Sequence, residues 1–202
     1  MSIASPPFSL AFYPQVELQN TYNLKRKYIH DMMYWKVVCD MTEVEKRQHR
    51  VCFTGHRPEK LTVPESIVKR ELEREIRHAI ADDMTVFISG MARGVDLWAA
   101  EIVLRLRTQG LTIKLICAIP FEGFERSWNA ADKQLYEKIV TAADHVMFIC
   151  PRYSRSCFQI RNEWMVNHSA RVIAVYTGKP GGTKNTIDYS MRRKVPVVFL
   201  DV

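Results

Sequence analysis

The sequence has no run of about 18 consecutive apolar residues, so we expect no membrane-spanning helix. Its first 14 residues are rich in apolar side chains, but they lack the basic start and the small-residue cleavage site of a secretory leader. We therefore expect a cytosolic protein.

Cysteine is sparse and shows no paired spacing. The five cysteines contain no C-x-x-C pair, which argues against a zinc knuckle and against a disulfide framework. Cys52, Cys117 and Cys150 lie in or beside apolar runs, where we expect them to act as small core residues. The six histidines also lack metal-ligand spacing, so we expect no metal site.

Two familiar phosphate-binding motifs are missing as well. The chain contains no G-x-G-x-x-G dinucleotide fingerprint. Gly178-Lys179 does not belong to a P-loop, because Pro180 follows it and Ile173 stands where the first glycine is required. Walker-type ATP hydrolysis is therefore disfavoured.

The composition is that of an ordinary globular protein with an excess of positive charge. Of the 202 residues, 47% are hydrophobic and 25% are charged, which is typical of a soluble domain. The 29 Lys and Arg against 22 Asp and Glu give a net charge of +7. This excess favours anionic partners, but it does not choose between nucleic acid, free nucleotide and mere solubility.

Residues 1–49 differ from the rest, because they mix aromatics, prolines and charges without sustained periodicity. We expect an N-terminal extension here and one domain over residues 50–202. Two interpretations of the extension stay open. Translation starts at Met41 and the earlier residues are dispensable or disordered, or Tyr22–Val38 forms a helix that packs on a partner chain.

From Val51 onward, short apolar runs alternate with amphipathic stretches, which is typical of a parallel sheet covered by helices. The strands are expected at Val51–Thr54, Val86–Ser89, Ile113–Ile119, His145–Cys150, Val172–Tyr176 and Val197–Leu200. The helices are expected at Pro64–Ala81, Asp96–Arg107, Glu125–Ala142, Gln159–Ser169 and Thr183–Arg193. This order predicts an α/β fold of Rossmann-like type, a doubly wound and mostly parallel sheet of about six strands with helices on both faces.

The loop after the first expected strand contains Gly55, His56 and Arg57. Glycine lets the backbone approach a ligand closely, arginine can bind a phosphate through two hydrogen bonds, and histidine can donate a hydrogen bond or transfer a proton. The same residues would also serve as a tight strand exit with an exposed arginine. Both interpretations stay open.

The loop after the second strand runs from Ser89 through Gly90, Arg93 and Gly94 to Asp96. Its two glycines bracket a turn that opens a helix, and the free N–H groups of a helix start bind anions readily. Asp96 is equally well placed to cap that helix.

The loop after the fifth strand places Gly181, Gly182, Thr183 and Thr186 before another helix. It could be a flexible connector. All three loops, however, follow parallel strands and so share the carboxyl edge of the sheet, where such folds bind ligands. Together they predict a pocket for phosphate and ribose.

At these loops the sequence resembles the YspA/YpsA-like family of the SLOG superfamily of Rossmannoid proteins. The resemblance covers about residues 50–202 and rests on five motifs in order. These are TGHRPEKL (54–61), SGMARGVDLWAAE (89–101), IPFEGFERSW (119–128), RNEWMV (161–166) and GGTKNT (181–186). Relatives in the superfamily include the cytokinin-activating phosphoribohydrolases and DNA-processing protein A.

The resemblance implies a nucleotide-derived ligand, for example one like NAD or ADP-ribose. It adds four binding candidates, Pro120, Trp128, Tyr153 and Arg161. Trp128 could stack on a base or belong to the core. Arg161 near a helix start is poorly placed for the helix dipole, which favours a ligand role.

One departure from the superfamily bears on catalysis. The phosphoribohydrolases carry a glutamate three residues after the threonine of P-G-G-x-G-T-x-x-E, but here the position three after Thr186 is Tyr189, and Asp188 lies one residue short. A hydrolase would have to use Glu101, Glu163 or Asp188. We therefore favour binding or sensing, with N-glycosidic hydrolysis and single-stranded nucleic-acid binding as alternatives. A homo-oligomer is compatible with the fold.

Overall fold

The computed structural model describes residues 41–200. The strands are β1 (Arg50–Gly55), β2 (Val86–Ser89), β3 (Lys114–Ile119), β4 (His145–Phe148), β5 (Arg171–Val175) and β6 (Val197–Phe199). The helices are α2 (Glu43–Gln48), the 3-10 helix η1 (Pro58–Lys60), α3 (Glu65–Ala81), α4 (Val95–Thr108), α5 (Ala130–Ala142), α6 (Cys157–Asn167) and α7 (Gly182–Arg192).

The six strands form one sheet in the order β4-β3-β2-β1-β5-β6, and every neighbouring pair is parallel. Cys52 in the central strand β1 pairs with Ile88 on one side and with Val172 on the other. The predicted Rossmann-like α/β fold is therefore confirmed.

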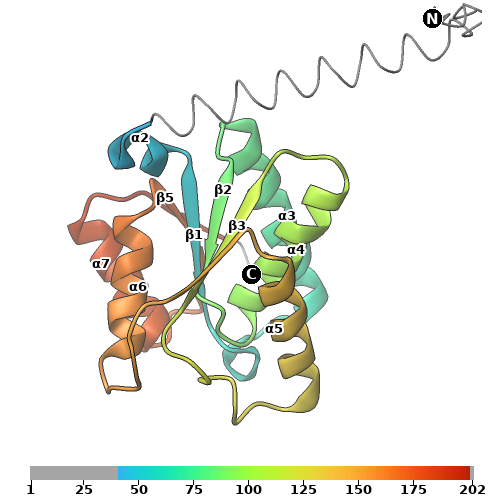
Figure 1. Cartoon of the computed structure of the whole chain (residues 1–202), viewed down its shortest axis with the longest axis vertical. Coiled ribbons are helices and arrows are strands. Elements are labelled where there is room, and N and C mark those ends of the chain that lie inside the picture. The colour runs from blue at the N-terminus through green and yellow to red at the C-terminus, as the bar shows by residue number, and fades with distance from the viewer. Residues whose placement is uncertain (1–40, 201–202) are drawn as a thin grey trace, which may run out of the picture. The chain divides into compact units, whose positions relative to one another are not determined.

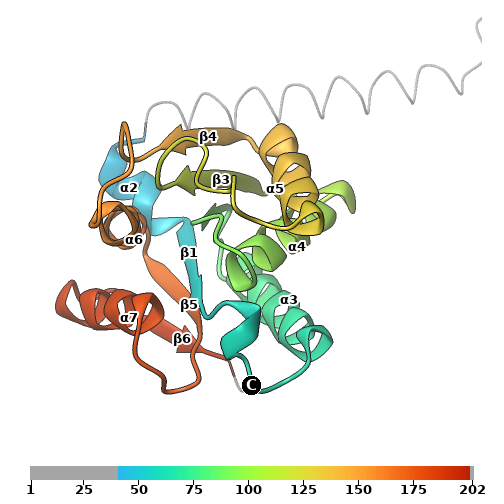
Figure 2. The same cartoon turned by 90° about the horizontal axis from the view of Figure 1, so that it is seen from below.

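Helices cover both faces of the sheet, with α3, α4 and α5 on one side and α6 and α7 on the other (Figures 1 and 2). Side chains of β1 alternate between two cores, because successive residues of a strand point to opposite faces. Val51 and Phe53 belong to the larger core with α3 and α4, and Cys52 belongs to the smaller core with Met165 of α6.

The helix predicted from Glu125 begins at Ala130, so that prediction was wrong at its start. Gly123 has a φ of 76°, a left-handed conformation outside helix geometry. Asn129 then caps α5, because its Oδ1 accepts a hydrogen bond of 2.9 Å from Asp132 N. Residues 120–129 therefore form a loop at the carboxyl end of β3.

Two smaller differences concern β4 and α2. Strand β4 was expected to reach Cys150 but ends at Phe148, because its neighbour β3 ends at Ile119. Helix α2 was not predicted, since none of its residues is buried and no apolar stripe marks it. Arg47 connects α2 to the domain by donating a hydrogen bond of 3.0 Å to Ser169 O.

Along the chain, the strand order runs outward from β1 to β4 and then crosses back to β5. The carboxyl ends of β1 and β5 consequently flank the point where the direction of winding reverses. Open α/β sheets bind their ligands at this crevice. Figure 2 views the sheet from the side on which these ends lie.

Within residues 41–200, no helix combines the length and apolarity needed to cross a membrane. The same range contains no group of three or more His, Cys, Asp or Glu side chains that could hold a metal ion. Its four cysteines, Cys52, Cys117, Cys150 and Cys157, are buried and unpaired. The expectations for residues 1–40, including the helix over Tyr22–Val38, lie outside the described residues.

Candidate functional site

A cleft of about 480 Å³ opens at the carboxyl edge of the sheet. Its walls come from the loops after β1, β2 and β3 and from the starts of α6 and α7. The lining residues are Phe53, Thr54, Gly55, His56, Arg57, Lys60, Ala92, Arg93, Asp96, Phe124, Ser127, Trp128, Phe158, Arg161, Asn162, Met165, Gly182 and Thr183.

One end of the cleft is built to receive an anion. The N-cap of α7 is Gly181, which has no side chain to cap the helix, and the first turn of α7 contains no acidic residue. Gly182 and Thr183 of that turn line the cleft together with Arg57 and Lys60. A Cβ on Gly181 would lie 3.6 Å from Lys60 Nζ. Free helix N–H groups and a lysine thus lie side by side, as an oxyanion requires.

His56 lies buried beside this anion end. Its Nδ1 is 3.5 Å from Thr183 Oγ1, and its ring stacks on Tyr176 at a centroid distance of 5.5 Å. Its Nε2 has no hydrogen-bond partner among residues 41–200. Burial, followed by the charges of Lys60 and Lys179, lowers the pKa of His56, so the ring is neutral at pH 7.

The floor of the cleft holds one acidic and one basic side chain, and both are buried. Arg161 and Asp96 are 4% and 6% exposed, and Arg161 Nη1 lies 3.8 Å from Asp96 Oδ2. Burial raises the pKa of Asp96 to about 6, although Arg161 and the N–H of Ala92 oppose this shift. The pair fits only because position 90 is glycine, since a Cβ there would overlap Arg161 Nη1 and lie 2.7 Å from Asp96 Oδ2.

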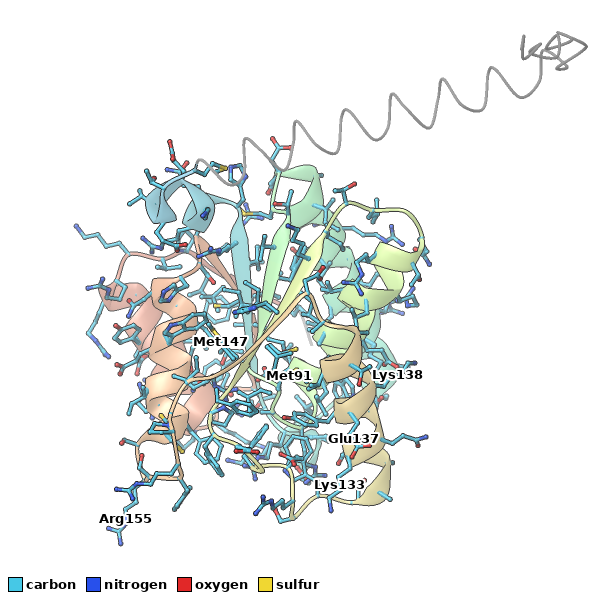
Figure 3. All side chains as sticks on the ribbon, in the orientation of Figure 1. Met91, Lys133, Glu137, Lys138, Met147 and Arg155 are labelled. Carbon is cyan, nitrogen blue, oxygen red and sulfur yellow. The ribbon has the colours of Figure 1, made fainter. Side chains whose placement is uncertain are left out.

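The loop between β2 and α4 is fixed by its own hydrogen bonds. Ser89 Oγ donates to Asp96 O at 2.8 Å and accepts from Met91 N at 3.1 Å. Met91 is completely buried with a φ of 60°, an uncommon conformation for a residue with a side chain. Its position at the lower end of the sheet is visible in Figure 3. Gly94 has a φ of 85°, and a Cβ there would meet Pro58 Cδ at 2.7 Å.

The end of the cleft on the β3 side of the sheet, away from β5 and α7, is aromatic. Phe124, Trp128 and Phe158 line it, and the rings of Phe124 and Trp128 meet edge to face at a centroid distance of 4.9 Å. Tyr136 packs edge-on against both of these rings from behind, in the core. Rings held in this way form a rigid apolar wall against which a planar ligand group can pack.

Arg93 lines the cleft, but two carboxylates already hold its guanidinium. Its Nε donates a hydrogen bond of 2.6 Å to Asp132 Oδ2, and its Nη1 lies 2.9 Å from Glu59 Oε1. Glu59 belongs to η1 and Asp132 to the first turn of α5. Arg93 therefore joins three separate loops of the cleft wall.

The structure brings nine of the sixteen predicted binding residues together in the cleft. These are Gly55, His56, Arg57, Arg93, Asp96, Trp128, Arg161, Gly182 and Thr183. The other seven do not line it, namely Ser89, Gly90, Gly94, Pro120, Tyr153, Gly181 and Thr186. Most of these support the lining from behind, as Gly90 does for Arg161, whereas Tyr153 is 63% exposed beside the ring of Phe121.

None of the three candidate catalytic carboxylates lines the cleft. Glu101 pairs with Lys69 of α3 at 3.2 Å, because its phase on α4 turns it toward that neighbouring helix. Glu163 accepts a hydrogen bond of 2.8 Å from Gln159 on α6, and Asp188 pairs with Lys184 on α7. Of the residues that the structure describes, Asp96 is the one acidic residue that lines the cleft.

Sequence reasoning missed Lys60, Phe124, Phe158 and Asn162, all of which line the cleft. Lys60 and Phe124 lie inside the motifs TGHRPEKL and IPFEGFERSW, so the motifs themselves were the available signal. Phe158 and Asn162 come from the first half of α6, one turn apart. In the sequence, nothing distinguishes this phenylalanine and this asparagine from the ordinary residues of a helix.

Residues 51–196 match the family model described as YspA SLOG family, YpsA. A UPF0398 protein of Bacillus cereus strain G9842 is 30% identical over 153 residues, which cover 71% of this chain and 83% of that protein. A UPF0398 protein of Bacillus thuringiensis strain Al Hakam shows the same identity and coverage.

This chain also resembles the solved structure of DNA processing protein A from Helicobacter pylori. That structure was reported for the single-stranded DNA binding mode of that protein. The TM-score is 0.56, and the match covers 79% of this chain and 68% of the other. At 19% sequence identity the likeness shows a shared fold. The cleft described above thus belongs to a chain with many relatives and a known architecture.

Proposed function

Because this chain belongs to the YspA SLOG family, we propose that its cleft binds a nucleotide-derived small molecule of the NAD or ADP-ribose kind. The observation that carries the proposal is the pairing of an anion end and an aromatic end in one cleft. A nucleotide is a phosphate and a planar base joined by a sugar, and these ends match its two outer parts.

The anion end supports phosphate binding through two separate sources of positive potential. One is the start of α7, where free N–H groups and the helix dipole favour negative charge. The other is Arg57 and Lys60, whose side chains have no hydrogen bond or ion pair to residues 41–200. A phosphate would therefore not have to displace a carboxylate to reach them.

The aromatic end supports base binding, and the size of the cleft supports a ligand of nucleotide size. Phe124, Trp128 and Phe158 offer apolar ring surface without a hydrogen-bonding code, so they select a planar group in general. A volume of about 480 Å³ lies within the range of roughly 300–1,000 Å³ found for small-molecule sites.

The two alternatives receive less support. N-glycosidic hydrolysis would need a carboxylate at the substrate, and Glu101, Glu163 and Asp188 all lie outside the cleft lining. Single-stranded DNA binding is described for the Helicobacter pylori neighbour, which matches this chain at 19% sequence identity. A single cleft with two unlike ends fits a discrete small ligand better than a continuous strand, which would need a repeated row of stacking and phosphate contacts.

A thermal-shift screen tests the proposal against ADP, ATP, NAD, ADP-ribose and a dT oligonucleotide. A ligand at 100 times its dissociation constant should stabilise the fold by about 2.7 kcal/mol. We expect a shift with a small nucleotide that is reduced in Lys60→Ala and kept in Lys138→Ala. Lys138 is exposed on α5 and points away from the sheet (Figure 3). Lys138→Ala therefore removes the same charge at a place outside the cleft. A shift with the oligonucleotide alone, or none at all, would contradict the proposal.

A further inference from the structure

Asp96 and Arg161 form a buried pair that is incompletely satisfied by the protein. Their closest charged atoms are 3.8 Å apart, which is longer than a hydrogen bond. Burial of both groups costs free energy that a loose ion pair does not recover. A buried acid and base in this state are therefore suited to taking further partners from the cleft.

The hydrogen bonds of Arg161 leave one side of its guanidinium open. Nε donates to Asn162 Oδ1 at 2.8 Å, and Nη1 lies 3.5 Å from Ala118 O. Nη2 has no hydrogen bond within residues 41–200, although it carries two N–H groups. Nη2 is not one of the fully buried polar atoms that lack a partner. It is therefore accessible from the cleft that Arg161 lines.

The carboxylate of Asp96 is open in the same way. Oδ2 accepts a hydrogen bond of 3.3 Å from Ala92 N and faces Arg161. Oδ1 has no hydrogen-bond partner in the described part of the chain. It is not fully buried either, so a ligand in the cleft can reach it. One free acceptor and one free pair of donors thus belong to neighbouring side chains on the cleft floor.

This combination selects hydroxyl groups over charged groups. A phosphate would be attracted by Arg161 but repelled by Asp96. An ammonium group would be attracted by Asp96 but repelled by Arg161. A hydroxyl donates to a carboxylate and accepts from a guanidinium, so two neighbouring hydroxyls satisfy both residues at once. A vicinal diol is the chemical group with this pattern.

The position of the pair along α6 agrees with this selection. Arg161 follows Phe158 of the aromatic end by about one turn, and the next residue, Asn162, lies beside Gly182 of the anion end. A Cβ on Gly182 would be 3.9 Å from Asn162 Nδ2. The pair therefore occupies the stretch of cleft between the two ends, where the sugar of a nucleotide would lie.

We propose that Asp96 and Arg161 form a subsite for the 2′- and 3′-hydroxyls of a ribose, which makes the cleft selective for ribonucleotides. This inference rests on the proposed function and specifies its ligand further. A merely structural ion pair would stabilise the fold without distinguishing one sugar from another. The subsite predicts in addition that deoxyribose, and hence DNA, is disfavoured.

Isothermal titration calorimetry with ADP, 2′-deoxy-ADP and 3′-deoxy-ADP tests the subsite on the full chain without any variant. Loss of one hydrogen bond to a charged group should weaken binding about 10- to 150-fold. The same titrations on Asp96→Asn and Arg161→Lys should bring the ADP to 2′-deoxy-ADP ratio below about threefold. Lys138→Ala should keep the wild-type ratio.

The outcomes separate this inference from the proposed function. Equal affinity of the wild-type protein for ADP and both deoxy forms overturns the subsite and leaves nucleotide binding intact. A lower melting temperature in the Asp96 and Arg161 variants with an unchanged ratio also overturns it, since that is the result of a structural pair. If neither ADP nor ADP-ribose binds, the proposed function fails and the subsite fails with it.

Discussion

Arg93 and Asp132 are joined by a hydrogen bond of 2.6 Å although 38 other residues separate them in the chain. The same guanidinium reaches Glu59, so it ties η1, the loop after β2 and the start of α5 to one another. Asn129 Nδ2 donates to Asp132 Oδ2 at 2.8 Å and holds the carboxylate in place. Arg93 thus acts as a clasp of the cleft wall, with its charge largely compensated by two acids.

The clasp predicts coupled effects of Arg93→Ala and Asp132→Asn. The side chains are 26% and 24% exposed, so a double-mutant cycle of urea unfolding should give a coupling of about 1 kcal/mol. Both single variants should also weaken ADP binding to a similar extent, because each loosens the same wall. If Asp132→Asn instead tightened ADP binding while Arg93→Ala abolished it, Arg93 would be a direct phosphate ligand.

The raised pKa of Asp96 predicts a specific dependence of stability on pH. Burial raises this pKa from 3.8 to about 6, so the folded state binds the proton more tightly than the unfolded state. The carboxyl therefore stabilises the fold below pH 3.8, and this contribution is lost as the pH rises through about 6. Between pH 5 and pH 7 the loss amounts to roughly 1 kcal/mol.

Urea unfolding of the wild type and of Asp96→Asn at these two pH values measures that loss. The wild type should lose about 1 kcal/mol more free energy of unfolding than the variant does. Other titrating groups, including His56, occur in both proteins and cancel in the comparison. Equal changes in the two proteins would mean that Asp96 titrates below pH 5.

Gly90→Ala should disturb the cleft floor from behind. The new methyl group would overlap Arg161 Nη1, and because Arg161 is 4% exposed its guanidinium has little room to move aside. We expect ADP affinity to fall at least tenfold. Gly110→Ala is the control, because its φ of 96° makes alanine unfavourable while no atom lies within 4 Å. The control should lose stability and keep its affinity for ADP.

Trp128→Ala should weaken the binding of ligands that carry a base and leave the binding of ligands without a base unchanged. Truncating an aromatic side chain under a nucleic-acid base typically costs about 1–3 kcal/mol. ADP affinity should fall accordingly, while the affinity for ribose 5-phosphate should stay within about twofold. Trp128→Phe should recover part of the loss. A parallel loss for both ligands would assign Trp128 to the core instead, where it already contacts Phe124.

The sequence predicted those parts of the site that follow from strand order. His56, Arg57 and Thr183 were found because each follows or precedes an element whose polarity fixes the edge on which it lies. The same logic placed Gly182, whose backbone N–H belongs to a helix start. These features depend on local sequence and on parallel topology, and both can be recognised without coordinates.

The parts that escaped prediction depend on packing between distant segments. Arg93 was assigned to a ligand because its partners Glu59 and Asp132 become neighbours only through the fold. Glu101 was a catalytic candidate because nothing local shows that its helix turns it toward Lys69. Residues 125–129 matched a helical pattern, yet they form a loop, and the helix begins only after the Asn129 cap.

An amide titration by ¹⁵N NMR with ADP-ribose tests the central claim most directly, because it reports where the ligand binds. We expect saturable shifts at Gly182 and Thr183 of the anion end, at Phe124 and Trp128 of the aromatic end, and at Arg161 between them. Shifts confined to a basic surface outside the cleft, such as the loop tip at Arg155 (Figure 3), would contradict it. The absence of any shift at millimolar ADP-ribose would contradict it equally.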